Sequence, residues 1–299
     1  MASVIVPAYN EGQVIGRLLS QLVPARSSSD LEIIVVANGC SDNTVEIARS
    51  FGPRIVVRSV PVASKHQALL EGDKAATGFP RVYLDSDVAV RAVDIWELVA
   101  ELERPGVLAA APRRDFDFTG CPWPVRWYYD IWQRLPEVRR GLFGRGVVAL
   151  STAGHQRLAG LSPLLADDLA ASLCFAPSER SVAAGARVVC YPPRTLRDLL
   201  RRRIRVVTGV AQIERSADAP PSTARTSPAD LVAIVRAEPA VAVKVTVFAA
   251  VTLAARWRAR RVISRGDYAT WQRDESSRSG GPAREPAGKV PRQPAGEVR

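Results

Sequence analysis

Short apolar runs alternate with amphipathic segments along residues 1–115. The runs are "SVIVPAY", "LEIIVVAN", "RIVVRSV" and "RVYLDSD", and each precedes a stretch with apolar residues at helical spacing. After the first run, one face of the predicted helix collects Val14, Ile15, Leu18, Leu19 and Leu22. Because the strands are rich in Val and Ile with little polar alternation, the pattern predicts a parallel sheet covered by helices on both faces.

The same pattern continues over residues 107–215, where "VLAAAPR", "RGVVALS" and "ARVVCYPP" are further predicted strands. The predicted fold class is therefore α/β, with a mostly parallel, Rossmann-like central sheet flanked by helices and a C-terminal helical segment. We predict one domain over 1–215 and a Pro/Ser/Ala-rich linker over 216–228. A hydrophobic and basic helical extension follows over 229–262, and a low-complexity, largely disordered tail over 263–299.

The extension contains the apolar run "AVAVKVTVFAAVTLAA", residues 240–255, followed by "RWRARR". The run is shorter than the roughly 20 residues that span a bilayer, and Lys244 interrupts it. An interfacial helix with a basic flank on an anionic membrane surface fits this pattern. A C-terminal helix packed on the domain, with a solvated arginine face, fits it equally well.

Polar side chains stand directly after three of the predicted strands. They are Tyr9-Asn10-Glu11, the segment from Asn38 to Asp42, and the pair Asp85 and Asp87. With right-handed crossovers, the carboxyl ends of parallel strands meet at one edge of the sheet, where ligands bind. Since buried carboxylates without partners are costly, the clusters predict a polar or cationic ligand at this edge.

Asp85 and Asp87 are two residues apart, so in an extended chain their side chains point the same way. Oxygen ligands favour Mg²⁺ or Mn²⁺, and such an ion would hold a diphosphate and stabilise it as a leaving group. A solvated turn after a strand is the structural alternative, because Asp and Ser are ordinary turn residues.

The formal net charge is +11, with an excess of Arg near the C-terminus. This charge suits nucleic acid, an anionic membrane or a phosphate-bearing substrate, but no recognisable nucleic-acid module supports the first. The first strand-to-helix turn lacks GxGxxG, which disfavours a dinucleotide-dependent oxidoreductase. Four widely separated cysteines without CxxC pairs, and an N-terminus without a signal-peptide pattern, indicate reduced thiols in a cytoplasmic protein.

Four motifs occur in order along residues 2–215: "VIVPAYNE", "VVANGCSDNT", "LDSD" and "ADDLAASL". Their sequence and spacing resemble glycosyltransferase family 2. The segment "TWQRDESSR" near the C-terminus also resembles the tails of bacterial members. The resemblance implies a GT-A fold and an inverting, metal-dependent enzyme with Mg²⁺ or Mn²⁺ as cofactor. It implies a nucleotide-diphosphate sugar as donor and a hydroxyl acceptor, lipid-linked or small, in cell-envelope glycan, glycolipid or secondary-metabolite synthesis.

The resemblance also implies roles for individual residues of the donor site. Asp85 and Asp87 correspond to the metal and ribose-diphosphate pair, with Asp87 as the more direct ligand. Lys65 matches a basic residue that faces phosphate. The remaining nucleotide-binding positions that the resemblance implies are Pro7, Tyr9, Asn10, Glu11, Asn38 and Asp42. Asn38 stands where the family commonly has Asp, which removes a charge and keeps hydrogen-bonding capacity.

In "LLADDLAASL", Asp167 and Asp168 match the family's acidic dipeptide, which implies that Asp168 is the general base. An inverting transfer needs such a base to take the proton of the acceptor hydroxyl. A neighbouring carboxylate, here Asp167, raises the proton affinity of the base. A helix N-cap is the structural alternative for this pair.

Arginines are concentrated in "LLRRRIRVVTG", where the family often has a basic motif near the diphosphate. Arg201, Arg202 and Arg203 are therefore candidate diphosphate ligands, with a solvated basic face as the alternative. Leu200 and Ile204 stand where processive synthases have Gln and Trp of a QxxRW motif. This departure favours transfer of a single sugar.

Two other functions stay open from the sequence. A nucleotidyltransferase on a related sheet would use the same metal and carboxylates, but "PAYNEGQVIG" lacks the expected Gly/Arg-rich phosphate loop. A catalytically inactive nucleotide-sugar-binding protein, peripheral on the inner face of the plasma membrane, is compatible with the altered "ANGC" segment.

Overall fold

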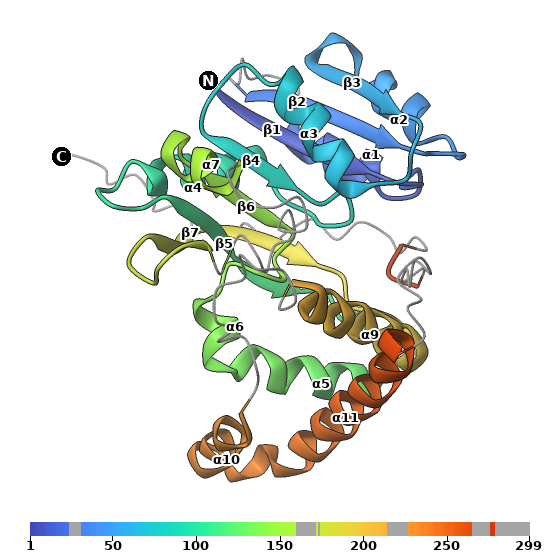
Figure 1. Ribbon diagram of the computed structural model, residues 1–299, viewed down its shortest axis with the longest axis vertical. Coiled ribbons are helices and arrows are strands. Elements are labelled where there is room, and N and C mark those ends of the chain that lie inside the picture. The colour runs from blue at the N-terminus through green and yellow to red at the C-terminus, as the bar shows by residue number, and fades with distance from the viewer. Residues whose placement is uncertain (24–30, 160–171, 173, 214–226, 265–275, 279–299) are drawn as a thin grey trace, which may run out of the picture.

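The computed structural model describes residues 1–23, 31–159, 172, 174–213, 227–264 and 276–278. The described strands form one seven-stranded sheet in the order β3-β2-β1-β4-β6-β5-β7 (Figure 1). They are β1 (Ala2–Ala8), β2 (Leu31–Asn38), β3 (Ile55–Val60), β4 (Arg81–Leu84), β5 (Ala109–Phe116), β6 (Val147–Leu150) and β7 (Arg180–Cys190). β6 is antiparallel to both its neighbours, β4 and β5, and every other pairing is parallel. The predicted mostly parallel sheet is confirmed.

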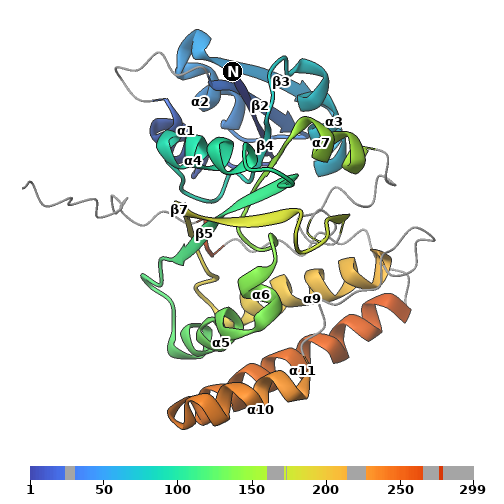
Figure 2. The same cartoon turned by 90° about the vertical axis from the view of Figure 1, so that its left-hand side faces the viewer.

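Helices cover both faces of this sheet, as Figure 2 shows. One face packs against α1 (Ile15–Leu22), α2 (Thr44–Ser50) and α4 (Ala92–Leu102), and the other against α3 (Lys65–Ala75) and α7 (Thr152–Ala159). The alternation along β1 separates the two layers, because Val4 and Val6 pack towards α1 while Ile5 packs towards α3. The apolar residues predicted on the first helix are buried as expected.

A second helical layer lies beyond β5 and β7, in the lower half of Figure 1. It contains α5 (Trp123–Arg134), α6 (Pro136–Arg140), α9 (Leu196–Ile213), α10 (Pro228–Ala237) and α11 (Ala242–Ser264). Two short 3₁₀ turns, η1 (Gly52–Arg54) and η3 (Pro239–Val241), complete the described elements. The core of this layer includes Phe248, whose ring stacks on that of Tyr128 with centroids 5.0 Å apart. The side of α5 that carries Val125, Tyr128, Tyr129 and Ile131 is buried in this core, whereas Trp123 is exposed.

The helix α11 is longer than the apolar run that predicted it, because it continues without a break through "RWRARR". Within the described part of the chain, Pro239–Ser264 is the one helical segment long and apolar enough to cross a membrane. Its buried side packs on α5 and α9 through residues such as Phe248 and Ala255. The packed-helix interpretation therefore describes one side of α11, and the opposite side is exposed.

Lys244 anchors this helix rather than interrupting it. Its Nζ lies 2.6 Å from Asp130 Oδ2 on α5, and Arg134 donates to the other carboxylate oxygen. Burial alone would raise the pKa of Asp130, but the hydrogen bonds from Lys244 and Arg134 lower it. The link between α5 and α11 is therefore present at neutral pH and is lost only as the pH falls through this lowered pKa.

The strand order reverses between the neighbouring strands β1 and β4. The register of β1 with β2 covers all seven residues of β1, whereas its register with β4 ends at Ile5. Pro7, which has no N–H to donate, lies beyond that point. The helices that follow β1 and β3 cover opposite faces, so the loops after β1 and β4 flank a topological switch point.

Candidate active site

The loops after β1 and β2 are tied to each other by polar side chains. Asn10 has φ +51°, and its Oδ1 accepts a hydrogen bond of 2.8 Å from the backbone N–H of Ser41. The N–H of Gly12 donates to Asp42 Oδ2 at 2.9 Å. Asn10 and Asp42, both predicted nucleotide-binding residues, thus hold the two loops together at this edge of the sheet.

Asn38 is buried where β1, β2 and α3 meet. In the amide orientation that satisfies its neighbours, it donates to the carbonyl of Ala8 at 2.6 Å and accepts from the N–H of Ser64 at 3.2 Å. A carboxylate cannot donate to a carbonyl, so the amide suits this position. Pro7 is buried within β1, and Tyr9 is half-buried directly after it.

Three carboxylates meet two cations at the switch point. Lys65 Nζ, at the start of α3, lies 2.7 Å from Asp85 Oδ1. Arg278 donates from Nε to both carboxylate oxygens of Glu11, at 3.0 and 2.9 Å, and from Nη2 to Asp87 Oδ2 at 3.0 Å. The predicted convergence of Glu11, Asp85, Asp87 and Lys65 on one region is what the structure shows.

The charge of Asp87 is stabilised by several cations. Burial alone would raise its pKa, but Arg278, followed by Arg202, Arg205 and Lys65, holds the pKa of this carboxyl below its usual range. Asp87 is therefore ionised at neutral pH. A cationic surrounding of this strength also suits an anionic ligand beside the carboxylate.

Only part of the arginine cluster on α9 faces this centre. Arg202 acts on Asp87, as does Arg205, three residues further along the helix. Arg201 instead pairs with Asp198 at 3.1 Å, and the guanidinium of Arg203 lies over an aromatic ring of α5. Sequence reasoning missed Arg205, although its helical spacing from Arg202 places both on one face.

The backbone around the acidic pair is held from two sides. The N–H of Asp85 donates to the carbonyl of Gly146 at 2.7 Å, and Arg17 Nη2 lies 3.4 Å from the carbonyl of Asp87. Gly146 has φ +66°, and a Cβ there would lie 2.6 Å from Val88 Cγ1. Glycine is required at this close approach.

The predicted general base, Asp168, and its neighbour Asp167 lie outside the described residues. Their role stays a prediction. The described centre combines carboxylates, a residue type that can hold a cation, with arginine and lysine side chains, a residue type that can hold phosphate.

The carboxylates of Asp85 and Asp87 fit a divalent cation whose remaining ligands come from a substrate. Within the described residues, no group of three or more His, Cys, Asp or Glu side chains is placed to hold a metal alone. Asp85 and Asp87 each use one carboxylate oxygen in the ion pairs above, and a carboxylate has two. Mg²⁺ characteristically binds through one or two carboxylates together with substrate phosphates and water, which is compatible with this pair.

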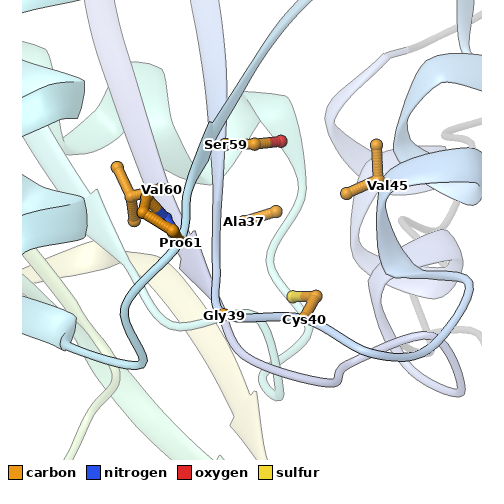
Figure 3. Close-up of a pocket in the computed structure, with 7 residues that line it drawn as sticks. All are labelled: Ala37, Gly39, Cys40, Val45, Ser59, Val60 and Pro61. Atoms are coloured by element: carbon orange, nitrogen blue, oxygen red, sulfur yellow. The ribbon is translucent and has the colours of Figure 1, made fainter.

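A hollow of about 450 Å³ lies at the carboxyl ends of β2 and β3 (Figure 3). It is lined by the ends of β2 and β3 and the start of α2, with Gly39, Cys40 and Pro61 among its residues. The carboxylates of Glu11, Asp85 and Asp87 do not line it. The acidic centre and this hollow are therefore separate features of the structure.

Comparison with known proteins assigns the chain to a family. The family model "Glycosyl transferase family 2" matches residues 3–155. An uncharacterised glycosyltransferase of Mycobacterium tuberculosis is 27% identical over 197 residues, which cover 64% of this chain and 86% of that protein. The chain belongs to glycosyl transferase family 2 and is a transferase, as the resemblance of its motifs predicted.

Solved structures show the same fold. A mannosyltransferase from Pyrobaculum calidifontis, solved with GDP-Man and Mn²⁺, superposes with a TM-score of 0.55 at 21% identity, covering 89% of this chain and 79% of that one. Glucosyl-3-phosphoglycerate synthase from Mycobacterium tuberculosis, solved with Mn²⁺, UDP-Glc and phosphoglyceric acid, gives 0.53 at 20% identity, covering 75% and 81%. The predicted GT-A architecture, with its C-terminal helix, is confirmed.

Proposed function

We propose that this chain is an inverting, metal-dependent glycosyltransferase that moves a single sugar from a nucleotide-diphosphate sugar to an acceptor hydroxyl. The observation that carries the proposal is the meeting of Glu11, Asp85 and Asp87 at the switch point, with Lys65 and Arg202 beside them. The two solved relatives bind GDP-Man or UDP-Glc with Mn²⁺. Their ligands match the chemistry of this cluster.

Each side chain has a task in this proposal. Asp87 and Asp85 hold Mg²⁺ or Mn²⁺, which when bound neutralises charge on the departing diphosphate. Lys65 and Arg202 stabilise the same developing charge from the protein side. Glu11 accepts hydrogen bonds from the ribose. Asp168 removes the proton of the acceptor hydroxyl as that oxygen attacks the anomeric carbon from the face opposite the leaving group.

The acceptor is proposed to be lipid-linked or a small molecule, used in cell-envelope glycan, glycolipid or secondary-metabolite synthesis at the cytoplasmic face of the membrane. The exposed side of α11 supports this location, because Val243, Leu253 and Trp257 are each more than half exposed and arginines follow them.

We expect the full chain to sediment with phosphatidylglycerol vesicles and to stay in the supernatant with phosphatidylcholine vesicles. Equal behaviour with both lipids contradicts this location.

A thermal-unfolding panel tests the donor class. We expect UDP, GDP, ADP or dTDP to raise the melting temperature of the full chain only when Mn²⁺ or Mg²⁺ is present, since ligand binding to the native state stabilises it. A panel without any metal-dependent shift contradicts the proposal.

The product then separates the alternatives. Turnover of the matching nucleotide sugar is expected to release nucleoside diphosphate. It should also form a glycoside with inverted anomeric configuration, and both products are visible by NMR. Release of pyrophosphate from a nucleoside triphosphate in the presence of a sugar 1-phosphate would instead indicate a nucleotidyltransferase. Binding without turnover across a panel of alcohol acceptors would indicate the inactive binding protein.

A further inference from the structure

The segment Ser276–Arg278 reaches the acidic centre from the far end of the chain. Arg278 is separated by 267 residues from Glu11 and by 191 from Asp87, yet it bridges the two. Its side chain is 15% exposed, so the guanidinium lies inside the site and not on its rim. The family model ends at residue 155, and Arg278 is the last residue of the "TWQRDESSR" segment, to which sequence reasoning assigned no part in the donor site.

The segment is docked beside the arginine helix. The Oγ of Ser276 accepts a hydrogen bond of 2.9 Å from the backbone N–H of Arg194, just before α9. Ser276 also hydrogen-bonds Asp198, in the first turn of α9, and this contact helps to lower the pKa of that carboxyl. Ser277 is buried. These contacts bring Arg278 to the same centre that Arg202 and Arg205 reach from α9 itself.

The position of the guanidinium defines what it can recognise. It lies between Glu11, after β1, and Asp87, after β4, and therefore at the switch point of the sheet, the position at which open α/β sheets bind their ligands. A guanidinium presents a planar set of donors that matches phosphate oxygens as well as carboxylates. A ligand that enters between Glu11 and Asp87 must meet Arg278.

We propose that Arg278 is a ligand of the donor diphosphate, supplied by the C-terminal segment to complete the donor site. This inference rests on the proposed function. When a metal-bound nucleoside diphosphate enters, Arg278 exchanges its hydrogen bond to Asp87 for hydrogen bonds to phosphate oxygens. Ser276 keeps the segment in place during the exchange. No covalent bond changes in this step.

An inhibitory role for Arg278 predicts the opposite change in nucleotide affinity. If Arg278 only blocked the site, its removal would free Asp87 and strengthen nucleotide binding. As a diphosphate ligand, its removal weakens nucleotide binding, while Mn²⁺ alone, which competes with the guanidinium for Asp87, binds no more weakly than before. A collapse of the site would weaken both.

The test is calorimetric titration of the full chain with UDP, GDP, ADP and dTDP in saturating Mn²⁺, and with Mn²⁺ alone. We expect Arg278→Ala to weaken nucleotide binding about tenfold or more, which is typical of a lost charged hydrogen bond. Arg278→Lys should recover part of this loss. Arg49→Ala, an exposed arginine on α2, is the matched control and should bind as wild type does.

Each remaining outcome counts against the inference. Unchanged or tighter nucleotide binding by Arg278→Ala, or weaker binding of Mn²⁺ alone, overturns the role of Arg278 and leaves the proposed function in place. Failure of the wild-type chain to bind any of the four nucleotides overturns the proposed function and this inference together.

Discussion

Replacement of Asp87 by Asn is expected to lower sugar transfer by about 1,000-fold and to remove metal-dependent nucleotide binding. Asn has nearly the same shape but no charge, so it cannot serve Mn²⁺ as a carboxylate does. It would also leave the cations around Asp87 with less negative charge to offset them. Initial rates with the matching nucleotide sugar, together with calorimetric titration of its nucleoside diphosphate, measure the two effects.

The control for this substitution is Asp115→Asn on β5. Asp115 is about half exposed and pairs with Arg187 at 3.2 Å. Its loss removes an equal charge and should change transfer by less than about twofold, as expected for a surface ion pair. Transfer by Asp87→Asn within tenfold of the wild-type rate would show that Asp87 is not a ligand of the metal.

Arg145→Ala is expected to lower the free energy of unfolding by about 3 kcal/mol. Arg145 is 3% exposed, and its guanidinium donates to the carbonyls of Gly141, Pro112 and Arg139 at 3.1, 2.9 and 3.1 Å. Burial, with repulsion from Arg114, lowers its pKa to about 9, so the charged form depends on these carbonyls. Alanine would leave the carbonyls without their donor and open a cavity.

Urea unfolding followed by circular dichroism measures this loss. Arg187→Ala is the matched control, because that side chain is 58% exposed and should change stability by less than about 1 kcal/mol. Since Arg145 precedes Gly146, whose carbonyl accepts from Asp85, nucleotide binding should weaken as well. Equal urea midpoints of unfolding for Arg145→Ala and Arg187→Ala would show that Arg145 does not stabilise the loop between α6 and β6.

Local patterns predicted the first half of the domain well. The runs of β-branched residues correspond to β1, β2, β3 and β4, and the helices between them bury the predicted faces. The convergence of polar loops also followed from topology, because parallel strands joined by helices place their carboxyl ends together. Glu11 and Asp85 were therefore predictable as neighbours, whereas Lys65 was expected beside them only from the family resemblance.

Which arginines of α9 lie near the acidic centre was not predictable in the same way. Four arginines occur between positions 201 and 205, and hydropathy does not say which of them face the sheet. In the packed structure Arg202 and Arg205 are near enough to Asp87 to help lower its pKa, whereas Arg201 pairs with Asp198. Asn38 and Asp42 similarly proved to link loops, because the backbone groups that they bind lie in other segments.

The order of apolar and polar residues by itself determined the class of sheet, its two helical layers and the edge at which acidic side chains gather. Those features depend on neighbours within a few tens of residues, which periodicity encodes. Only the tertiary structure showed that Arg278 reaches that edge from the opposite end of the chain. Contacts at such separations depend on how whole elements pack, and no local pattern records them.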